Sequence, residues 1–272
     1  MQISKKSRAA LLLASLAAIG SSGALAQTAQ SGQTAQTPAP VASEPADPFA
    51  FNVGVVTDYR FRGISQTRRE PALQGGADFT SPIGLYAGFW ASTIKWIRDL
   101  DGGSRVELDV YGGYRGKIND NFAYDVGVLR YQYPNSRLAV TPNTTELYGA
   151  LTFGPATVKY SRGITDETFG VPNSKGTGYL EAAATFDLGN GFALTPHIGR
   201  QAYRGSNFGV SNKVASYTDL SLGLVKDFGN GLSASATIVA TNADKGFYTS
   251  LPTAGSKYLG KDGVVLGLKY GF

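Results

Sequence analysis

His197 is the one histidine in a chain of 272 residues that contains no cysteine. Thiolate chemistry and cysteine metal sites are excluded, and a zinc site, which usually draws on several histidines or cysteines, is not expected. A hydrolase would have to use His197, yet no Gly-x-Ser-x-Gly elbow presents a nucleophilic serine. A lone histidine on a polar face is more often a hydrogen-bonded structural residue. We therefore predict a protein that is not an enzyme, with no catalytic residue, no metal and no cofactor.

Charged side chains recur at alternate positions of extended segments. In residues 105–117, Glu107, Asp109 and Arg115 share one phase, while the opposite phase is apolar. Because a strand sends successive side chains to opposite faces, such a segment has one wet face and one apolar face. The residues on the polar face of the predicted strands are the predicted pore-lining residues: Asp58, Arg60, Gln74, Asp78, Glu107, Asp109, Tyr111, Arg115, Asp125, Glu146, Lys159, Glu181, Asp187, His197, Asp219, Asp227 and Lys269.

Twelve such segments follow residue 50, and their connections alternate in length. Tight turns built from Gly, Asn, Asp, Ser or Pro fall at residues 81–82, 119–121, 154–155, 189–191 and 229–231. Longer polar stretches fall at 63–71, 95–104, 134–143, 163–177, 204–216 and 242–262. This alternation is typical of a membrane barrel with periplasmic turns and longer extracellular loops. The predicted fold is all-β, a transmembrane antiparallel β-barrel of twelve strands; ten or fourteen stay open because segments 84–94 and 158–161 are poorly defined.

Two details of the strands are expected. The first strand is predicted over residues 50–62, and Pro196 predicts a bulge or weakened pairing within its strand because proline cannot donate to a ladder. A Lys or Arg that faces lipid costs roughly 2–4 kcal/mol, so the apolar phase should meet lipid. Its aromatic residues predict girdles at both membrane interfaces: Tyr59, Phe61, Phe79, Tyr114, Phe122, Tyr124, Phe153, Phe186, Phe192, Phe228, Tyr270 and Phe272.

The N-terminal residues predict export. Residues 1–26 have a basic start, an apolar run and an Ala-Leu-Ala end, which is the pattern of a signal peptide cleaved before Gln27. Residues 27–49, rich in Gln, Thr, Ala, Ser and Pro, predict a disordered periplasmic leader, and residues 50–272 form the predicted barrel. Removing Lys5, Lys6 and Arg8 lowers the formal net charge from +5 to +2. That modest charge gives no reason to expect nucleic acid as a partner.

The last ten residues, Gly-Val-Val-Leu-Gly-Leu-Lys-Tyr-Gly-Phe, resemble the final strand of bacterial outer-membrane β-barrel proteins. The resemblance implies that Tyr270 and Phe272 are the signal for the barrel-assembly machinery. Residues 52–67, Asn-Val-Gly-Val-Val-Thr-Asp-Tyr-Arg-Phe-Arg-Gly-Ile-Ser-Gln-Thr, with the segment to Phe79, are similar to the TorF-type porin family of proteobacterial outer membranes. What this resemblance implies is a pore-forming barrel in the cell outer membrane, in contact with lipid and lipopolysaccharide.

The polar residues Asp58, Arg60, Arg62 and Gln66 have two interpretations, a charged cluster at a pore mouth or an ion-pair network that fixes barrel register. The predicted function is a porin-like channel for passive diffusion of small hydrophilic solutes. Acidic residues outnumber basic ones in the predicted lining, which favours cations or neutral solutes. The alternative is a barrel with a narrow or closed lumen whose extracellular loops bind a ligand or surface partner; an outer-membrane hydrolase is a further alternative, weakened by the single histidine.

Overall fold

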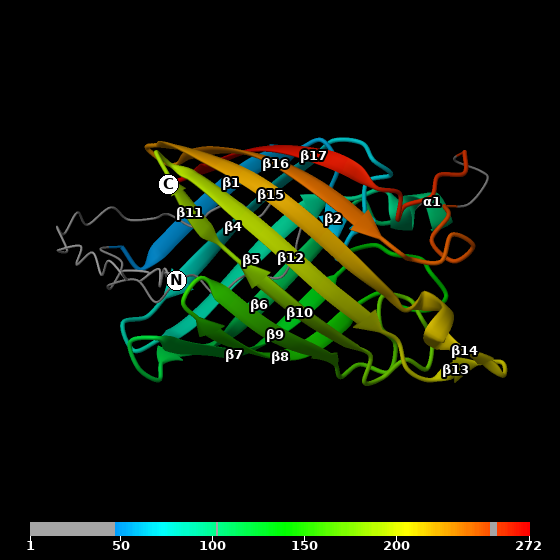
Figure 1. Ribbon diagram of the computed structural model, residues 1–272. Helices are drawn as coiled ribbons and strands as arrows, with labels where there is room; N and C mark the ends of the chain where they lie inside the picture. Colours follow the sequence, from blue (N-terminus) through cyan, green and yellow to red (C-terminus); the bar gives the residue numbers. More distant parts are fainter. Residues whose placement is uncertain (1–46, 102, 251–254) are drawn as a thin grey trace, which may run out of the picture.

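The computed structural model describes residues 47–101, 103–250 and 255–272, and within them the strands close into one antiparallel barrel (Figure 1). Thirteen hydrogen-bonded segments make the wall, and two of them, β10 and β11, run one after the other as a single wall strand, which gives twelve. The segments are β1 (Phe49–Val56), β4 (Ala72–Thr80), β5 (Leu85–Thr93), β6 (Val106–Lys117), β7 (Phe122–Gln132), β8 (Thr144–Phe153), β9 (Ala156–Gly163), β10 (Gly178–Ala184), β11 (Phe186–Gly189), β12 (Phe192–Ala202), β15 (Tyr217–Gly229), β16 (Leu232–Thr241) and β17 (Gly263–Gly271). The predicted twelve-stranded barrel is confirmed.

The barrel closes between its first and last strands. β1 pairs with β17 from Asn52↔Gly271 to Val56↔Gly267, and the terminal Phe272 exchanges two backbone hydrogen bonds with Phe51. One interruption of the ladder lies between β10 and β11, where pairing with β12 lapses across from Pro196. Proline has no N–H to donate, so the lapse falls where the sequence predicts weakened pairing.

The two ends of the barrel differ. All five tight turns lie at one end, which we call the turn end, together with the start of β1 and the C-terminus. The longer connections lie at the other, which we call the loop end, and contain α1 (Trp96–Asp101), the short pair β13 (Ser206–Asn207) and β14 (Val210–Ser211), and the 3₁₀ helix η1 (Asn212–Ala215). None of the helices within the described residues is long and apolar enough to cross a membrane.

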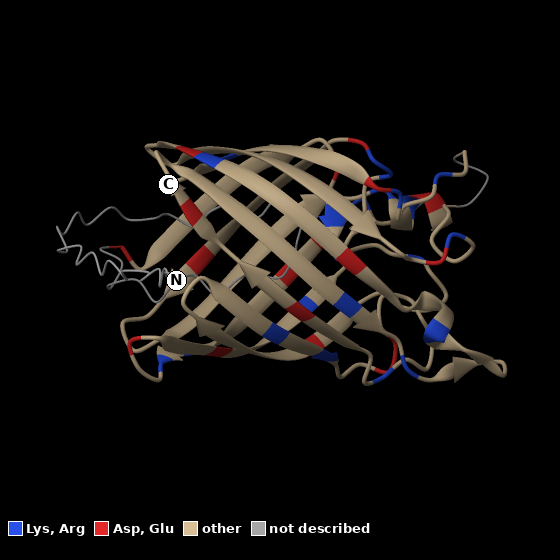
Figure 2. Cartoon of the chain, viewed as in Figure 1, with Lys and Arg blue, Asp and Glu red and all other residues tan. Residues whose placement is uncertain are grey.

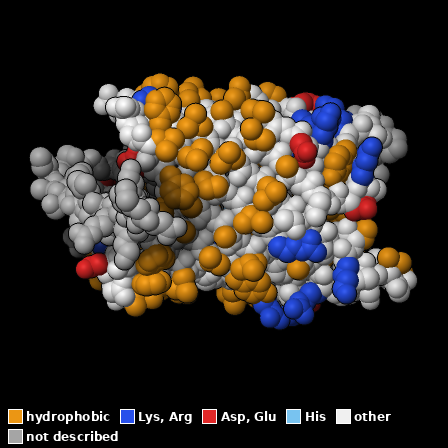
Figure 3. Space-filling view, viewed as in Figure 1, with side chains coloured by type: hydrophobic (Ala, Val, Ile, Leu, Met, Phe, Trp, Pro, Cys, Tyr) orange, Lys and Arg blue, Asp and Glu red, His pale blue; other side chains and the backbone are white. Residues whose placement is uncertain are grey.

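The outer wall is mostly apolar, and Figure 3 shows for one side of the barrel that Lys and Arg appear on it toward the loop end. Most of the aromatic residues predicted for two girdles do lie on this outer face. They gather beside the turns, however, so that among the described residues they form one belt at the turn end. The outer face nearer the loop end carries aliphatic side chains such as Leu180 and Ile238, together with the exposed Arg162 and Arg200. Two members were assigned to the wrong face: Tyr59 is fully buried and Phe61 is 9% exposed.

The prediction of a first strand over residues 50–62 is also wrong. β1 ends at Val56, and the chain then turns into the barrel, so that the expected loop over residues 63–71 is mostly buried. The alternation of polar and apolar side chains continues past Val56 because a segment inside the barrel also has two different surroundings. The predicted signal peptide, and residues 27–46 of the predicted leader, lie outside the described residues.

Candidate functional site

A short hairpin lies inside the lumen, in the half of the barrel nearer the loop end. β2 (Arg60–Phe61) pairs with β3 (Ile64–Ser65), and the turn between them places Arg62 at φ 47° and Gly63 at φ 81°. Two successive positive φ values are the geometry of the tight turn that joins hairpin strands without splaying them. Residues 58–68 are buried throughout, and Figure 1 places β2 within the outline of the barrel. We call residues 57–70 the plug hairpin.

Asp58 organises the plug hairpin from within. Its carboxylate accepts hydrogen bonds from Arg60 Nε at 2.5 Å, from Ser65 Oγ at 2.5 Å and from Thr67 Oγ1 at 3.2 Å. The Thr67 hydroxyl also accepts from the backbone N–H of Tyr59. These contacts satisfy both oxygens of a buried carboxylate, so they stabilise the hairpin from within.

Arg62 fixes the tip of the plug hairpin to the opposite wall. Its guanidinium makes a bidentate pair with Glu146 of β8, at 3.0 and 2.7 Å, and donates to Gln201 Oε1 of β12 at 2.7 Å. It also lies over the ring of Tyr179 of β10, 4.1 Å from the centroid. Burial acts to lower the pKa of Arg62, but Glu146 together with Tyr131 and Tyr179 more than offsets it, and the net shift of the pKa is upward.

The rest of the hairpin contacts other sides of the barrel. Tyr59 donates to Glu107 of β6 at 2.5 Å, and burial followed by that carboxylate raises the pKa of Tyr59 well above its usual value. On another side, Arg60 donates to the backbone carbonyls of Leu259 and Lys261, in the connection before β17. The plug hairpin is therefore held from several directions rather than hinged from one strand.

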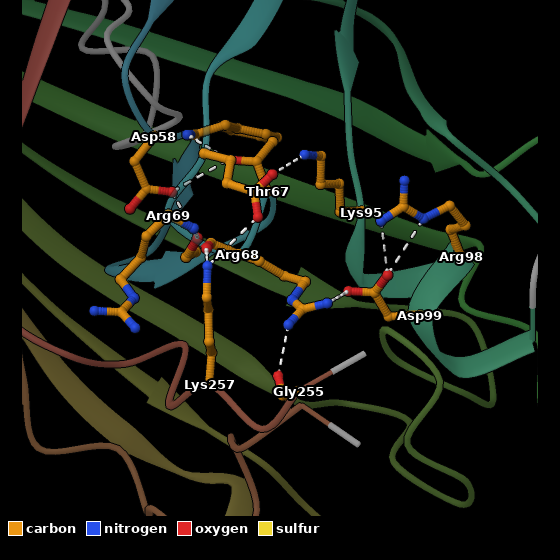
Figure 4. Close-up of polar contacts among 12 residues, drawn as sticks. Asp58, Thr67, Arg68, Arg69, Lys95, Arg98, Asp99, Gly255 and Lys257 are labelled. Atoms are coloured by element: carbon orange, nitrogen blue, oxygen red, sulfur yellow. Dashed lines mark hydrogen bonds and ion pairs between the residues drawn. The ribbon is translucent and has the colours of Figure 1, made fainter. Parts of the chain in front are cut away.

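The return arm of the hairpin is held at the loop end, as Figure 4 shows. Arg68 pairs with Asp99 of α1 at 3.0 Å and donates to the carbonyl of Gly255 at 2.6 Å. Glu70 pairs with Lys95 and with Lys257, and the hydrogen bond from Lys95 lowers the pKa of Glu70. These contacts connect the hairpin to two separate loops.

His197 lies below the plug hairpin, in the lumen. Its Nε2 is 3.3 Å from Glu181 Oε2 and 3.3 Å from the Tyr179 hydroxyl, and its Nδ1 is 3.5 Å from Asp219 Oδ1. Tyr179 also donates to Asp219 at 3.0 Å. The polar groups within 3.5 Å of the His197 ring are thus two carboxylates and a tyrosine, and Ser221 lies opposite His197 on the neighbouring strand β15.

Further polar contacts lie closer to the turn end. Tyr86 donates to Asp125 at 2.5 Å and meets the hydroxyl of Tyr148. Beside it, Tyr111 of β6 donates to Asp78 of β4 at 2.5 Å. Lumenal tyrosines lie across glycines of the neighbouring strand: a Cβ on Gly127 would be 2.5 Å from the Tyr148 hydroxyl. The rings therefore lie along the wall, where a side chain at the glycine would displace them.

The structure places most of the predicted lining residues inside the barrel, and Figure 2 shows the charged residues along the strands with further Lys and Arg in the loops. Asp58 and Arg60 lie on the plug hairpin instead of the wall. Asp187 and Asp227 accept from the backbone of Gly189 and Gly229 at the turn end, which is a turn-capping role. That the remaining residues line a conducting path stays a prediction. Among the described residues, no cluster of His, Cys, Asp or Glu could hold a metal ion.

The sequence predicted the polar cluster on residues 58–66, but it did not show that these residues lie inside the barrel. Of its two interpretations, the ion-pair network agrees with the observed contacts, because Arg60 and Arg62 are both paired and buried. The missed feature is the turn itself. An Arg-Gly pair flanked by Phe61 and Ile64 is a weak hairpin signal, since glycine favours the second position of such a turn.

The turn of the plug hairpin gives a direct test of its fit. Replacing Gly63 by alanine is expected to destabilise the protein by about 1–3 kcal/mol from the positive φ, with a further loss because the new Cβ would lie 2.8 Å from Asp219 Cβ. Gly229→Ala is the matched control, because Gly229 has φ 79° and nothing within 4 Å. Thermal unfolding of both variants checks this, and equal losses would contradict a tightly fitted tip.

Taken together, the fold and the site define a closed twelve-stranded antiparallel barrel whose lumen holds an inserted hairpin. The chain belongs to the family described as bacterial protein of unknown function (Gcw_chp), whose model matches residues 42–272. No curated protein matches the chain. The TorF-type resemblance of residues 52–79 is not tested by the family match and stays a prediction.

Solved structures share the fold. A structure titled KdgM porin is similar with a TM-score of 0.52 at 8% identity, covering 82% of this chain and 99% of that one. A structure titled KdgM porin in complex with disordered oligogalacturonate is similar with a TM-score of 0.51 at 7% identity, covering 82% and 98%. At such low identity the likeness establishes the barrel fold alone.

Proposed function

We propose that the protein is an outer-membrane channel for passive diffusion of small hydrophilic solutes, and that the plug hairpin keeps it mostly closed. The observation that carries the proposal is the contrast between the two faces of the wall. Charged and hydroxyl side chains such as Glu107, Asp125 and Lys159 are enclosed in the lumen, while large apolar side chains cover the outside. A spanning barrel places its polar face toward water and its apolar face toward lipid.

Location and partners follow from the same contrast. An exposed apolar wall of this extent would aggregate in water, so lipid and lipopolysaccharide are its proposed surroundings. A cleaved signal peptide over residues 1–26 would deliver the chain to the barrel-assembly machinery. Tyr270 and Phe272, whose rings stack at 5.7 Å on the outer wall, are the proposed assembly signal. The porins of similar fold support a channel as the class of function.

The proposed selectivity favours cations and neutral solutes. Below the plug hairpin the lumen holds Glu181, Asp219, Asp125 and Asp78 on the wall, against fewer basic side chains. An acidic path lowers the barrier for cations and raises it for anions. The retained alternative, a closed barrel whose loops bind a ligand, is favoured by one specific observation, the several-sided anchoring of the plug hairpin.

Planar bilayers with the mature protein test the channel directly. We expect brief openings in symmetric salt and, in a salt gradient, a reversal potential on the cation-selective side. A folded barrel, shown by heat-modifiable gel mobility, that never conducts would overturn the channel and favour the closed-barrel alternative. Anion selectivity would overturn the proposed selectivity alone.

The apolar wall gives a second test. Leu222 lies on the outer face of β15, with 47% of its surface exposed. Leu222→Arg is expected to cost roughly 2–4 kcal/mol of folding free energy in vesicles, because the charge would face hydrocarbon. Val214→Arg is the matched control: Val214 is 44% exposed but lies in η1 at the loop end, in water, where a surface change stays within about 0.5 kcal/mol. Urea titration in vesicles measures both, and a neutral Leu222→Arg would argue against a lipid-facing wall.

A further inference from the structure

The loop end holds a cavity of about 440 Å³ that opens above the plug hairpin. We call it the vestibule. Its floor is formed by hairpin residues from Phe61 to Gln66, and its sides by α1, by the connections after β7 and β9, and by the connection between β16 and β17. A concave site of this size, lined by loops far apart in sequence, is typical of small-molecule binding sites, which span roughly 300–1,000 Å³.

Aromatic rings dominate the lining. Trp96 packs edge-to-face on Tyr133 at 5.4 Å, Phe61 on Phe169 at 5.1 Å, and Tyr248 packs edge-to-face on Phe247 at 4.9 Å. Rings held in this way are rigid and present flat faces and edges to a guest. An aromatic ring entering the cavity gains both the burial of its area and the ring-to-ring geometry.

The charge of the lining restricts the guest further. Among the described residues that line the vestibule, Asp99 is the one that carries a charge. Its carboxylate is already paired with Arg68 at 3.0 Å and Arg98 at 2.9 Å. A charged guest would lose its hydration without gaining a counter-charge, which is costly. Gln66 adds a neutral carboxamide at the floor, of which Nε2 donates to the Ile64 carbonyl, whereas Ser65 and Gln201 are already bonded to Asp58 and Arg62.

We propose that the vestibule binds small neutral molecules that carry an aromatic ring together with a few hydroxyl or carbonyl groups. The aromatic walls bind the ring, and the Gln66 carboxamide at the floor binds a polar group of the guest. This site does not depend on conduction, because a closed barrel would bind the same molecules. It goes beyond the proposed channel by assigning a ligand class to the loop end.

The two tryptophans of the chain, Trp90 and Trp96, allow the binding to be followed optically. Trp90 is 3% exposed in the lumen, where it packs on Tyr59, whereas Trp96 lines the vestibule. Trp90→Phe therefore leaves one reporter in the site, and Trp96→Phe leaves one outside it. The probe is 4-nitrophenyl β-D-glucoside, a neutral aromatic quencher, titrated into the full barrel in lipid nanodiscs and compared with glucose and with 4-nitrobenzoate.

Saturable quenching by the glucoside is expected in Trp90→Phe, but not in Trp96→Phe. Glucose, which does not quench, is expected to leave glucoside binding unchanged when added in excess, and 4-nitrobenzoate is expected to bind at least about fivefold more weakly than the glucoside. Non-saturable or equal quenching of both reporters overturns the site, and equal affinity for 4-nitrobenzoate overturns the neutral ligand class.

A matched pair of phenylalanines completes the test. In the Trp90→Phe background, Phe247→Ala removes a vestibule ring, and it is expected to weaken binding by about five- to tenfold. Phe208→Ala removes a ring that is 99% exposed between β13 and β14, outside the lining, and it is expected to leave the affinity unchanged. Both variants are checked for folding by heat-modifiable mobility. Equal affinities in the two folded variants would contradict the vestibule as the binding site.

Discussion

Replacing Arg62 by leucine is expected to shift the equilibrium between the inserted and the released plug hairpin by about 3–5 kcal/mol toward release. The variant leaves the Glu146 carboxylate, 1% exposed, without its bidentate partner in the inserted state. In the released state water enters and solvates Glu146, so that state suffers no such loss. A shift of about 3 kcal/mol is roughly a hundredfold in a population ratio, which should appear as a similar rise in open probability in planar bilayers.

Two variants separate this cause from a general loosening of the barrel. Arg69→Leu changes an exposed arginine on the same hairpin, and its open probability is expected to equal that of the native chain. The double variant Arg62→Leu with Glu146→Leu removes both charges and should recover much of the closed state, because replacing a buried pair by apolar residues is often neutral. If the double variant opens as far as Arg62→Leu alone, the unpaired carboxylate is not what drives release.

The wall of the barrel was predictable because its two faces meet different solvents along its whole length. Alternation therefore marks every wall strand, and the turns carry residues that tolerate positive φ, such as Asn190 at 51° and Asn230 at 51°. The connection lengths then fix which end is which. Pro196 even predicted the place where the ladder lapses. These signals are local, so a sequence contains them in full.

The plug hairpin and the vestibule were not predictable in the same way. Residues 58–62 alternate as a wall strand would, since inside the lumen one side of the segment also faces polar groups and the other packs on rings such as Trp90 and Tyr131. Only the position of Glu146, 84 residues away, shows that Arg62 points across the barrel. The vestibule is formed by loops that converge only after the barrel has closed, and their separate sequences show nothing but polar connections with scattered aromatics.

Excising the plug hairpin is expected to raise the conductance more than any single substitution in the chain. Val56 of β1 is paired with Ala72 of β4, so a short Gly-Ser turn can join the two strands in place of residues 58–69 without disturbing the wall. Glu107 and Glu146 then lose Tyr59 and Arg62 and face a wet lumen. The barrel should stay open and become more strongly cation-selective, because the hairpin's basic residues are removed while the wall carboxylates remain.

Removal of a different hairpin provides the control for excision. Deleting residues 206–211, the β13–β14 pair, shortens a loop whose tip residue Phe208 is 99% exposed, and it should leave both conductance and selectivity at native values. Single-channel recordings of the two deletions in the same lipid make the comparison. An excised barrel that conducts no better than the native one would move the constriction deeper, to the lumenal side chains Tyr86, Asp125 and Tyr148 on the wall from β5 to β8. In that case the role of the plug hairpin would be to form the floor of the vestibule, and the lumenal tyrosines Tyr86 and Tyr148 would control the passage of solutes.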